Sequence, residues 1–326
     1  MGFIRLPIIE TVYIDDTAWS HRIWYWKIAY AISKVHDFKF TILCDYHNYL
    51  EYLFIDFPYT NFYFGNIDWI RVEKKDYSHL SFSNHILITP ENIESLEFNV
   101  NGNYLLDFNF GSPLEDVPQW IKDELPSCSI LKLREKNLET IIKEKVKDRT
   151  GIHLRMIDTY IYDKRGIDKL IKAAGSELEA FAKLSEDNSY YLATDINDKR
   201  FPYKETIVRY DGSVCPTYCE VRELIPDYTK YFKTEELYDK YDIIDYSEIM
   251  NSMYPDMKIR LEEKLDSIVG NTQDMAFDTD YEITMMRIFR DVIDIYSLVY
   301  SKEFIPSKDS TYSHTVHDFR GEEILK

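Results

Sequence analysis

Hydrophobic positions recur at helical spacing early in the chain. Between residues 21 and 36 the apolar side chains fall on one face of a helix, at Trp24, Ile28, Ala31, Ile32 and Val35. Ser20 precedes this pattern and is the residue type that caps a helix N-terminus. The pattern therefore predicts a helix over 21–36 with Ser20 as its N-cap.

Short runs of β-branched and aromatic residues lie on both sides of this helix, at 11–14 and 38–44. Strand, helix and strand in this order are typical of a parallel sheet. Further apolar runs at 86–88 and 104–106 predict two more strands.

A second set of alternating elements begins near residue 130. The hydrophobic pattern predicts helices over 137–147, 166–184 and 284–300, with a last one starting within 310–317. Strands are expected at 151–154, 190–193 and 304–305. The chain thus reads as two α/β units with a boundary within 110–135. A ligand is expected in the cleft at the carboxyl ends of the strands.

Composition and charge exclude several classes of protein. The 326 residues carry a net charge of −18, which argues against a nucleic-acid partner because phosphate backbones attract basic surfaces. No run of 18 apolar residues predicts a membrane span, and Met1 to Thr11 lacks the apolar core of a signal peptide. A reduced, cytoplasmic location is expected.

Metal ligands are sparse in the sequence. Cys215 and Cys219 form a C-x3-C pair, but no second pair or nearby histidine completes a four-ligand zinc site. Asp278 and Asp280 form a D-x-D just before a predicted helix, where acidic residues complement the helix dipole. We therefore expect no bound metal.

Three strand ends carry candidate chemistry. The first is 151–158, in which an apolar strand runs into His153, Arg155 and Asp158. The guanidinium of Arg155 suits a pair of phosphate oxygens. A buried ion pair between Arg155 and Asp158 is the structural alternative.

The other two candidate strand ends follow the same pattern. Strand 190–193 leads to Asp195, which could accept hydrogen bonds from a nucleobase or could simply cap a turn. Strand 304–305 leads to Ser310 and Thr311 at a helix start, where hydroxyls and backbone N–H groups bind phosphate well. An ordinary helix cap is the alternative there.

Taken in order, these three segments resemble the motifs of the fucosyltransferase superfamily. This superfamily includes the protein O-fucosyltransferases, the α1,6- and α1,2-fucosyltransferases and the nodulation fucosyltransferases. His153, Arg155 and Asp158 match its H-x-R-x-x-D motif, and Ala193–Asp195 matches a strand ending near "ATD". The helix, strand and Ser/Thr-rich turn of its third motif resemble 291–298, 304–305 and 310–313.

The resemblance implies a GT-B fold, in which two Rossmann-like domains face each other across a cleft. An acceptor-side domain would span 1–130 and a nucleotide-sugar donor domain would span 131–326. The implied reaction is transfer of a sugar, fucose from GDP-fucose in most members, to a glycan or glycoconjugate acceptor. The transfer would invert the sugar's stereochemistry and would require neither a metal nor another cofactor.

Residue roles carry over by position. Arg155 would clamp the β-phosphate, Asp158 would hold the Arg155 loop, and His153 and Asp195 would lie near the guanine or ribose. Ser310 and Thr311 would bind phosphate. The physical chemistry agrees, since leaving-group charge that no metal neutralises needs Arg, hydroxyls and helix-end amides.

The chain departs from the family pattern at two places. Many fucosyltransferases have a second Arg after the first, where this chain has Met156, and the family's glycine-rich loop is replaced by Ala18–Arg22. Arg22 could supply the missing positive charge. Asp16, or less favourably Asp15, is the candidate base that deprotonates the acceptor hydroxyl.

Three readings of function stay open from the sequence. The first is a fucosyltransferase. The second is a GT-B transferase that uses another GDP-sugar or a UDP-sugar. The third is a catalytically inactive relative that binds glycans or nucleotides. The absence of a predicted membrane span fits a bacterial or viral enzyme, or a catalytic fragment.

Overall fold

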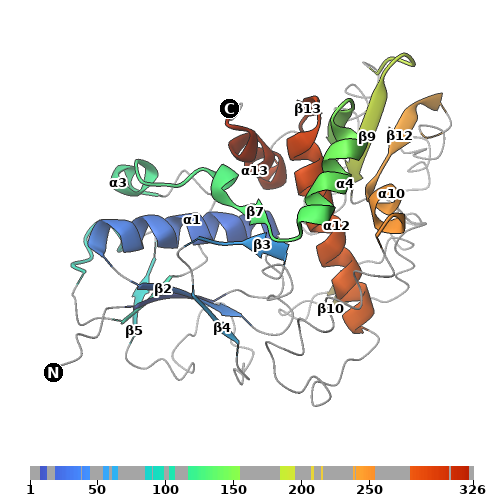
Figure 1. Cartoon of the computed structure of the whole chain (residues 1–326). Coiled ribbons are helices and arrows are strands. Elements are labelled where there is room, and N and C mark those ends of the chain that lie inside the picture. Colours follow the sequence, from blue (N-terminus) through green and yellow to red (C-terminus); the bar gives the residue numbers. More distant parts are fainter. Residues whose placement is uncertain are drawn as a thin grey trace. The chain divides into compact units, whose positions relative to one another are not determined.

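A computed structural model of the chain has mixed helices and parallel sheets (Figure 1). It describes residues 8–12, 19–37, 39–44, 54–58, 61–64, 85–89, 91–98, 103–106, 117–154, 184–194, 207–208, 214–215, 238, 240–253, 280–307 and 310–322. These residues fall into two compact units. The first unit takes its described residues from Met1–Lys136, Pro255–Val292 and His317–Lys326, and the second takes them from Asn137–Tyr254 and Ile293–Val316.

The first unit contains a five-stranded sheet whose neighbouring strands are all parallel. Its strands, in spatial order, are β4 (Asn61–Phe64), β2 (Lys39–Cys44), β1 (Ile8–Val12), β6 (Asn103–Leu106) and β5 (His85–Ile88). The chain runs outward from β1 through β2 to β4, whereas β6 lies on the other side of β1. The sheet therefore has a topological switch point between β1 and β6, the place where open α/β sheets hold ligands.

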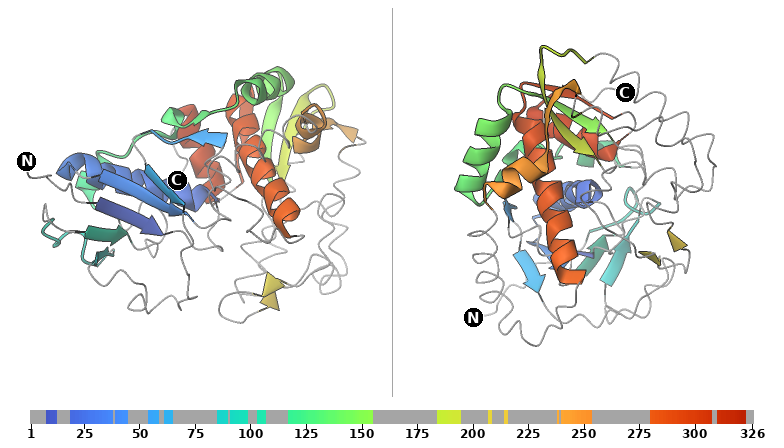
Figure 2. Two further views of the ribbon diagram at one scale, coloured as in Figure 1. Left: turned by 60° about the horizontal axis from the view of Figure 1, so that its bottom comes forward. Right: turned by 90° about the vertical axis from the view of Figure 1, so that its right-hand side faces the viewer.

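Helix α1 (Trp19–His36) lies along one face of this sheet (Figure 2). Four of the five residues predicted on its apolar face are buried: Trp24, Ile28, Ala31 and Ile32. Val35 is 46% exposed, because the buried part of the helix ends at Ser33. Ser20 is not the N-cap, because the helix begins at Trp19.

The remaining elements of the first unit are short. Strands β3 (Ile55–Asp56) and β7 (Lys132–Leu133) pair antiparallel. Helix α3 (Gln119–Lys122) and the 3-10 turn η2 (Cys128–Ile130) come between β6 and β7 in the chain. Ser127 caps η2, because its side chain accepts a hydrogen bond from the Ser129 N–H.

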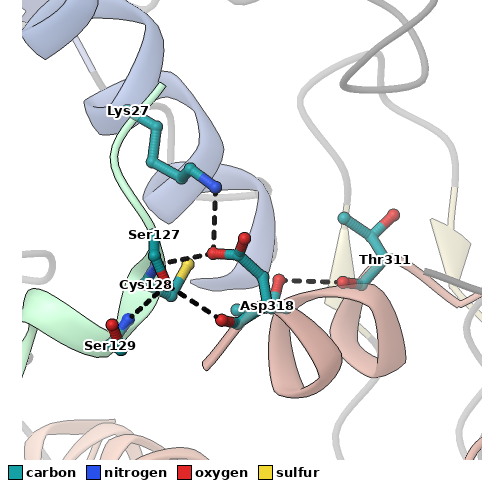
Figure 3. Close-up of polar contacts among 7 residues, drawn as sticks. Lys27, Ser127, Cys128, Ser129, Thr311 and Asp318 are labelled. Atoms are coloured by element: carbon teal, nitrogen blue, oxygen red, sulfur yellow. Dashed lines mark hydrogen bonds and ion pairs between the residues drawn. The ribbon is translucent and has the colours of Figure 1, made fainter. Parts of the chain in front are cut away.

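A partly buried charge cluster joins sequence-distant parts of the first unit (Figure 3). The Lys27 Nζ lies 2.9 Å from Asp318 Oδ2, which also accepts the backbone N–H of Cys128 at 2.5 Å. Lys27 Nζ additionally lies 3.9 Å from the centroid of the Trp24 ring, a cation–π contact. Burial raises the pKa of the Cys128 thiol well above its usual value, so this side chain is a neutral packing group.

The second unit contains a four-stranded sheet that is also parallel throughout. Its strand order is β12 (Asp242–Ile244), β9 (Ser189–Thr194), β8 (Thr150–Leu154) and β13 (Glu303–Ile305). Strands β8 and β9 are buried almost throughout, as expected for a parallel sheet covered on both faces. A separate antiparallel pair is formed by β10 (Ile207–Val208) and β11 (Val214–Cys215).

In this unit, helix α4 (Lys136–Val146) lies beside the last turns of helix α12 (Asp280–Tyr300), whose first turns belong to the first unit (Figures 1 and 2). The Tyr300 hydroxyl donates a hydrogen bond to Glu139 at 2.9 Å, and Lys143 lies over the Tyr300 ring. Gly151 of β8 approaches the end of α12 closely, since a Cβ there would lie 2.8 Å from Ser301 Oγ. Helices α10 (Tyr246–Asn251) and α13 (Thr311–Arg320) complete the described elements.

The α/β class predicted from the sequence is confirmed. Most predicted helices and strands have counterparts within a few residues, whereas the predicted helix over 166–184 lies outside the described residues. Strands β4 and β12 and helix α10 were not predicted. The two predicted domains, 1–130 and 131–326, stay a prediction.

Candidate functional site

Three segments of the second unit meet at one edge of its sheet. Strands β8 and β13 are parallel neighbours, with Ile305 paired to Ile152, so both run toward the same edge. His153 lies at the end of β8, and the chain after β13 leads through Ser307 to α13. The carboxyl edge of this sheet is therefore where the predicted residues His153, Ser310 and Thr311 are found.

Ser313 is the centre of the polar contacts at this edge. Its hydroxyl lies 2.8 Å from His153 Nδ1 and accepts the backbone N–H of Ser307 at 3.0 Å. All three residues are buried, with Ser313 only 1% exposed. One hydroxyl thus joins β8, the segment after β13 and the first turn of α13.

The ring of Tyr312 packs against this centre. The Tyr312 ring lies 4.7 Å from the His153 imidazole, centroid to centroid, at an interplanar angle of 36°. On the neighbouring strand β9, the Tyr191 hydroxyl donates a 2.6 Å hydrogen bond to the buried carboxylate of Asp294 in α12. Burial, and next the charge of Asp294, raise the pKa of Tyr191 well above its usual value, so this hydroxyl stays a donor.

Ser310 stands directly before α13 and carries an unpaired group. Its carbonyl accepts the backbone N–H of His314 at 3.0 Å, which places Ser310 at the N-cap. Its hydroxyl is buried and has no hydrogen-bond partner in the part of the chain that the structure describes. A buried hydroxyl without a partner is unfavourable in a folded protein, and such a group at a helix N-terminus is suited to an incoming acceptor.

Thr311 is the first residue of α13. Its carbonyl accepts a hydrogen bond from the Thr315 hydroxyl at 2.9 Å within the helix (Figure 3). The N-terminal amides of α13 and the positive end of its dipole lie beside Ser310. The imidazole of His153 lies at the same edge of the sheet.

The other predicted site residues lie outside the described residues, namely Arg155, Asp158, Asp195, Asp15 and Asp16. Arg155 directly follows the last residue of β8, and Asp195 directly follows the last residue of β9. Arg22 lies within α1, and only its backbone is described. Of the predicted set, the structure therefore places His153, Ser310 and Thr311 at one sheet edge.

Sequence reasoning missed the role of Ser313 and of the Ser307 backbone N–H. Ser313 lies in the Ser/Thr-rich turn 310–313 that the third motif singled out, but nothing in the local pattern indicates a partner 160 positions earlier. The sequence feature that could have pointed to Ser313 is its place in the first turn of a helix that follows a strand.

The described residues contain no group of three or more His, Cys, Asp or Glu side chains arranged to hold a metal ion. The His317 Nδ1 lies 3.0 Å from a carboxylate oxygen of Glu322. Within the same residues, no helix is both long enough and apolar enough to cross a membrane.

Comparison with known proteins gives structural neighbours only. No protein-family model matches the chain, and no curated protein matches its sequence. Among solved structures, the chain is similar to the fucosyltransferase NodZ from Bradyrhizobium, at 11% identity and a TM-score of 0.44, over 96% of this chain and 93% of that one.

Two further solved structures are similar to this chain. NodZ α-1,6-fucosyltransferase soaked with GDP-fucose has 9% identity and a TM-score of 0.45, over 97% of this chain and 93% of that one. A mutant of Arabidopsis thaliana FUT1 in complex with GDP has 10% identity and a TM-score of 0.43, over 99% and 70%. The two NodZ neighbours are fucosyltransferases.

Proposed function

We propose that this chain is a GT-B glycosyltransferase that moves fucose from GDP-fucose to a glycan acceptor, with inversion and without a metal. The observation that carries the proposal is the buried, unpartnered hydroxyl of Ser310 at the N-terminus of α13, on the sheet edge that also holds His153. This arrangement suits a sugar-nucleotide diphosphate.

The diphosphate binds at the start of α13. Ser310 donates its hydroxyl hydrogen to a phosphate oxygen, and the first amides of the helix donate to the same group. A helix N-terminus favours anions through these amides and through its dipole. Binding gives the Ser310 hydroxyl the partner that it lacks in the free protein.

The residues that follow the strands complete the donor site in this proposal. Arg155 pairs with the β-phosphate through its planar guanidinium, and Asp158 holds the Arg155 loop. His153 and Asp195 contact the guanine or ribose. Arg22 adds positive charge from α1, in place of the glycine-rich loop of the family.

The transfer is a single displacement at the anomeric carbon. The acceptor oxygen forms a bond to C1 of the sugar while the bond from C1 to the β-phosphate oxygen breaks, and GDP leaves with the bonding pair. Asp16, or alternatively Asp15, takes the proton of the acceptor hydroxyl. Negative charge that develops on GDP is stabilised by Arg155, the Ser310 hydroxyl and the amides of α13.

The departures from the family pattern support two alternatives. Met156 in place of a second Arg, and Ala18–Arg22 in place of a glycine-rich loop, fit a different sugar nucleotide or a protein that binds without turnover. Slow hydrolysis of the sugar nucleotide in the absence of acceptor separates a transferase from a binding protein.

Thermal unfolding with a panel of nucleotides tests the proposal. The panel contains GDP, UDP, GDP-fucose, GDP-mannose, UDP-xylose and UDP-glucose, each added to the wild type, Arg155→Ala and Arg149→Ala. A ligand at about 100 times its dissociation constant stabilises by roughly 2.7 kcal/mol, a shift of several degrees.

Arg149 is the matched control, since it precedes β8 and pairs with Asp242 at the opposite end of the strand from Arg155. We expect GDP and GDP-fucose to shift the wild type and Arg149→Ala, each relative to its own melting temperature, and not Arg155→Ala. A shift with UDP-sugars alone would contradict GDP-fucose as the substrate, and no shift with any nucleotide would contradict the donor site.

A further inference from the structure

The neighbours of the Ser313 hydroxyl determine which hydrogen bonds it donates and which it accepts. A serine hydroxyl has one hydrogen to donate and two lone pairs that accept. Among the described residues, the Ser313 hydroxyl has two hydrogen-bond partners, the Ser307 backbone N–H at 3.0 Å and His153 Nδ1 at 2.8 Å. Ser313 is 1% exposed, so these two partners account for its bonding.

These two partners determine to which atom the Ser313 hydroxyl donates its hydrogen. The Ser307 backbone N–H can only donate, so it occupies one lone pair of the Ser313 oxygen. The hydroxyl hydrogen is then left with a single acceptor, His153 Nδ1. A ring nitrogen that accepts a hydrogen bond carries no proton itself, so the proton of the neutral imidazole resides on Nε2.

The opposite arrangement leaves a group unsatisfied. If His153 carried its proton on Nδ1, this N–H would donate to Ser313, and the buried hydroxyl hydrogen would lose its only acceptor among the described residues. A buried polar hydrogen without an acceptor is costly, and the same cost opposes a doubly protonated imidazolium. The arrangement therefore favours one neutral tautomer of His153.

We propose that Ser313 is a positioning residue that holds His153 as the neutral Nε2–H tautomer, so that the imidazole enters the site as a hydrogen-bond donor. Its ligand is an acceptor atom of the guanine or ribose of the sugar nucleotide, such as a base carbonyl, a ring nitrogen or a ribose oxygen. This inference rests on the proposed function for the identity of the ligand, whereas the tautomer itself is a property of the free protein. Tyr312, whose ring packs against the imidazole, keeps the ring plane fixed.

Nuclear magnetic resonance of the histidine rings tests the tautomer directly. The chain has 8 histidines, and labelling them with 15N allows pyrrole-type and pyridine-type ring nitrogens to be distinguished in each. The His153 signals are assigned by their loss in His153→Gln. We expect wild-type His153 to show a protonated Nε2 and an unprotonated Nδ1, and Ser313→Ala to show a mixture of tautomers.

Two conservative variants separate positioning from simple structural damage. Ser313→Thr keeps the hydroxyl and should keep the single tautomer. Ser33→Ala is the matched control, since it removes a buried serine hydroxyl that bonds only the Ala29 carbonyl in α1. A protonated Nδ1 in the wild type, or an unchanged tautomer in Ser313→Ala, would overturn the inference.

Substitution of His153 tests which nitrogen donates. Gln can place an amide N–H near the position of Nε2, whereas Asn can place one only near Nδ1. We expect His153→Gln to retain most of the GDP affinity and His153→Asn and Ser313→Ala to lose about fivefold, the effect of one hydrogen bond. Equal losses in His153→Gln and His153→Asn would contradict donation from Nε2.

The two proposals fail in different ways. If the wild type binds none of the nucleotides while His153 is in the Nε2–H form, the proposed function is wrong and the tautomer assignment stands. If GDP binds and His153 carries its proton on Nδ1, the positioning role of Ser313 is wrong and the proposed function stands.

Discussion

The ammonium of Lys27 and the carboxylate of Asp318 form an ion pair of 2.9 Å between residues 291 positions apart. Lys27 is 2% exposed and Asp318 is 20% exposed, so the two charges differ in their access to water. The Cys128 backbone N–H donates a further hydrogen bond to Asp318 (Figure 3). The Trp24 ring lies against the Lys27 ammonium. This pair attaches the end of α13 to α1 within the first unit.

Substitution of Asp318 should destabilise the protein more than substitution of Lys27. Asp318→Asn leaves a fully buried ammonium without its counter-charge, which should lower the free energy of unfolding by about 3 kcal/mol or more. Lys27→Met leaves the better-exposed carboxylate, still bonded to the Cys128 N–H, and should cost less. Urea unfolding of both variants and of the double variant measures this, and a larger loss for Lys27→Met would contradict the account.

His36 should make the first unit sensitive to mild acid. Burial lowers the pKa of His36 below its usual 6.5, and the ring stacks on Phe98 at 4.2 Å. The unfolded chain therefore binds more protons than the folded one as pH falls below 6.5. The stabilisation is present above that pH and is lost as pH falls through the lower folded pKa.

The measurement for His36 is urea unfolding at about pH 7.5 and about pH 5.5. The wild type should lose more stability between these conditions than His36→Gln, whose side chain does not titrate. An equal loss in both proteins would show that His36 does not contribute to the pH dependence.

Gly151→Ala should destabilise the second unit. The new Cβ would lie 2.8 Å from Ser301 Oγ and 3.0 Å from Leu298 Cδ2, closer than side-chain packing allows. Overpacking of this kind costs about 1–3 kcal/mol. Adding Ser301→Gly removes one of the two close neighbours and should restore part of the loss in a thermal melt, whereas additive losses would contradict the steric explanation.

Tyr191→Phe should destabilise the same unit by a different mechanism. The substitution leaves the buried Asp294 carboxylate without the hydroxyl that donates to it at 2.6 Å, at a cost of about 1–3 kcal/mol. Tyr190→Phe is a matched control, because the Tyr190 hydroxyl contacts only the partly exposed backbone of Ser185 on the preceding turn. Chemical unfolding should show the larger loss for Tyr191→Phe.

Local patterns were sufficient for the elements with strong periodicity. The apolar face of α1 and the buried strands β8 and β9 were predicted because the pattern of apolar residues that indicates each of them lies within a few consecutive residues. Strand β4 was missed because its polar Asn61 and aromatic run fit no clear alternation. Strand β12 was missed because its two isoleucines lie between aspartates in an acidic stretch of the chain. Val35 was wrongly predicted to be buried, because helical periodicity does not show where along a helix the packing against other elements ends.

The site was predictable only in part, for a physical reason. The resemblance to fucosyltransferase motifs led to His153, Ser310 and Thr311, and the structure places them at one sheet edge. The bond between His153 and Ser313 depends on the parallel pairing of β8 with β13. Strand pairing over such a separation is decided by tertiary packing, which a local pattern does not contain.

Ser310→Ala tests the central claim most directly, because a ligand-binding role and a structural role predict opposite results. The measurement is the free energy of unfolding with and without saturating GDP. Since the Ser310 hydroxyl has no partner among the described residues, Ser310→Ala should leave the free protein as stable as the wild type or slightly more stable. The stabilisation by GDP should fall by about 1 kcal/mol. A free protein destabilised by the substitution, with the effect of GDP unchanged, would contradict a phosphate site at the start of α13.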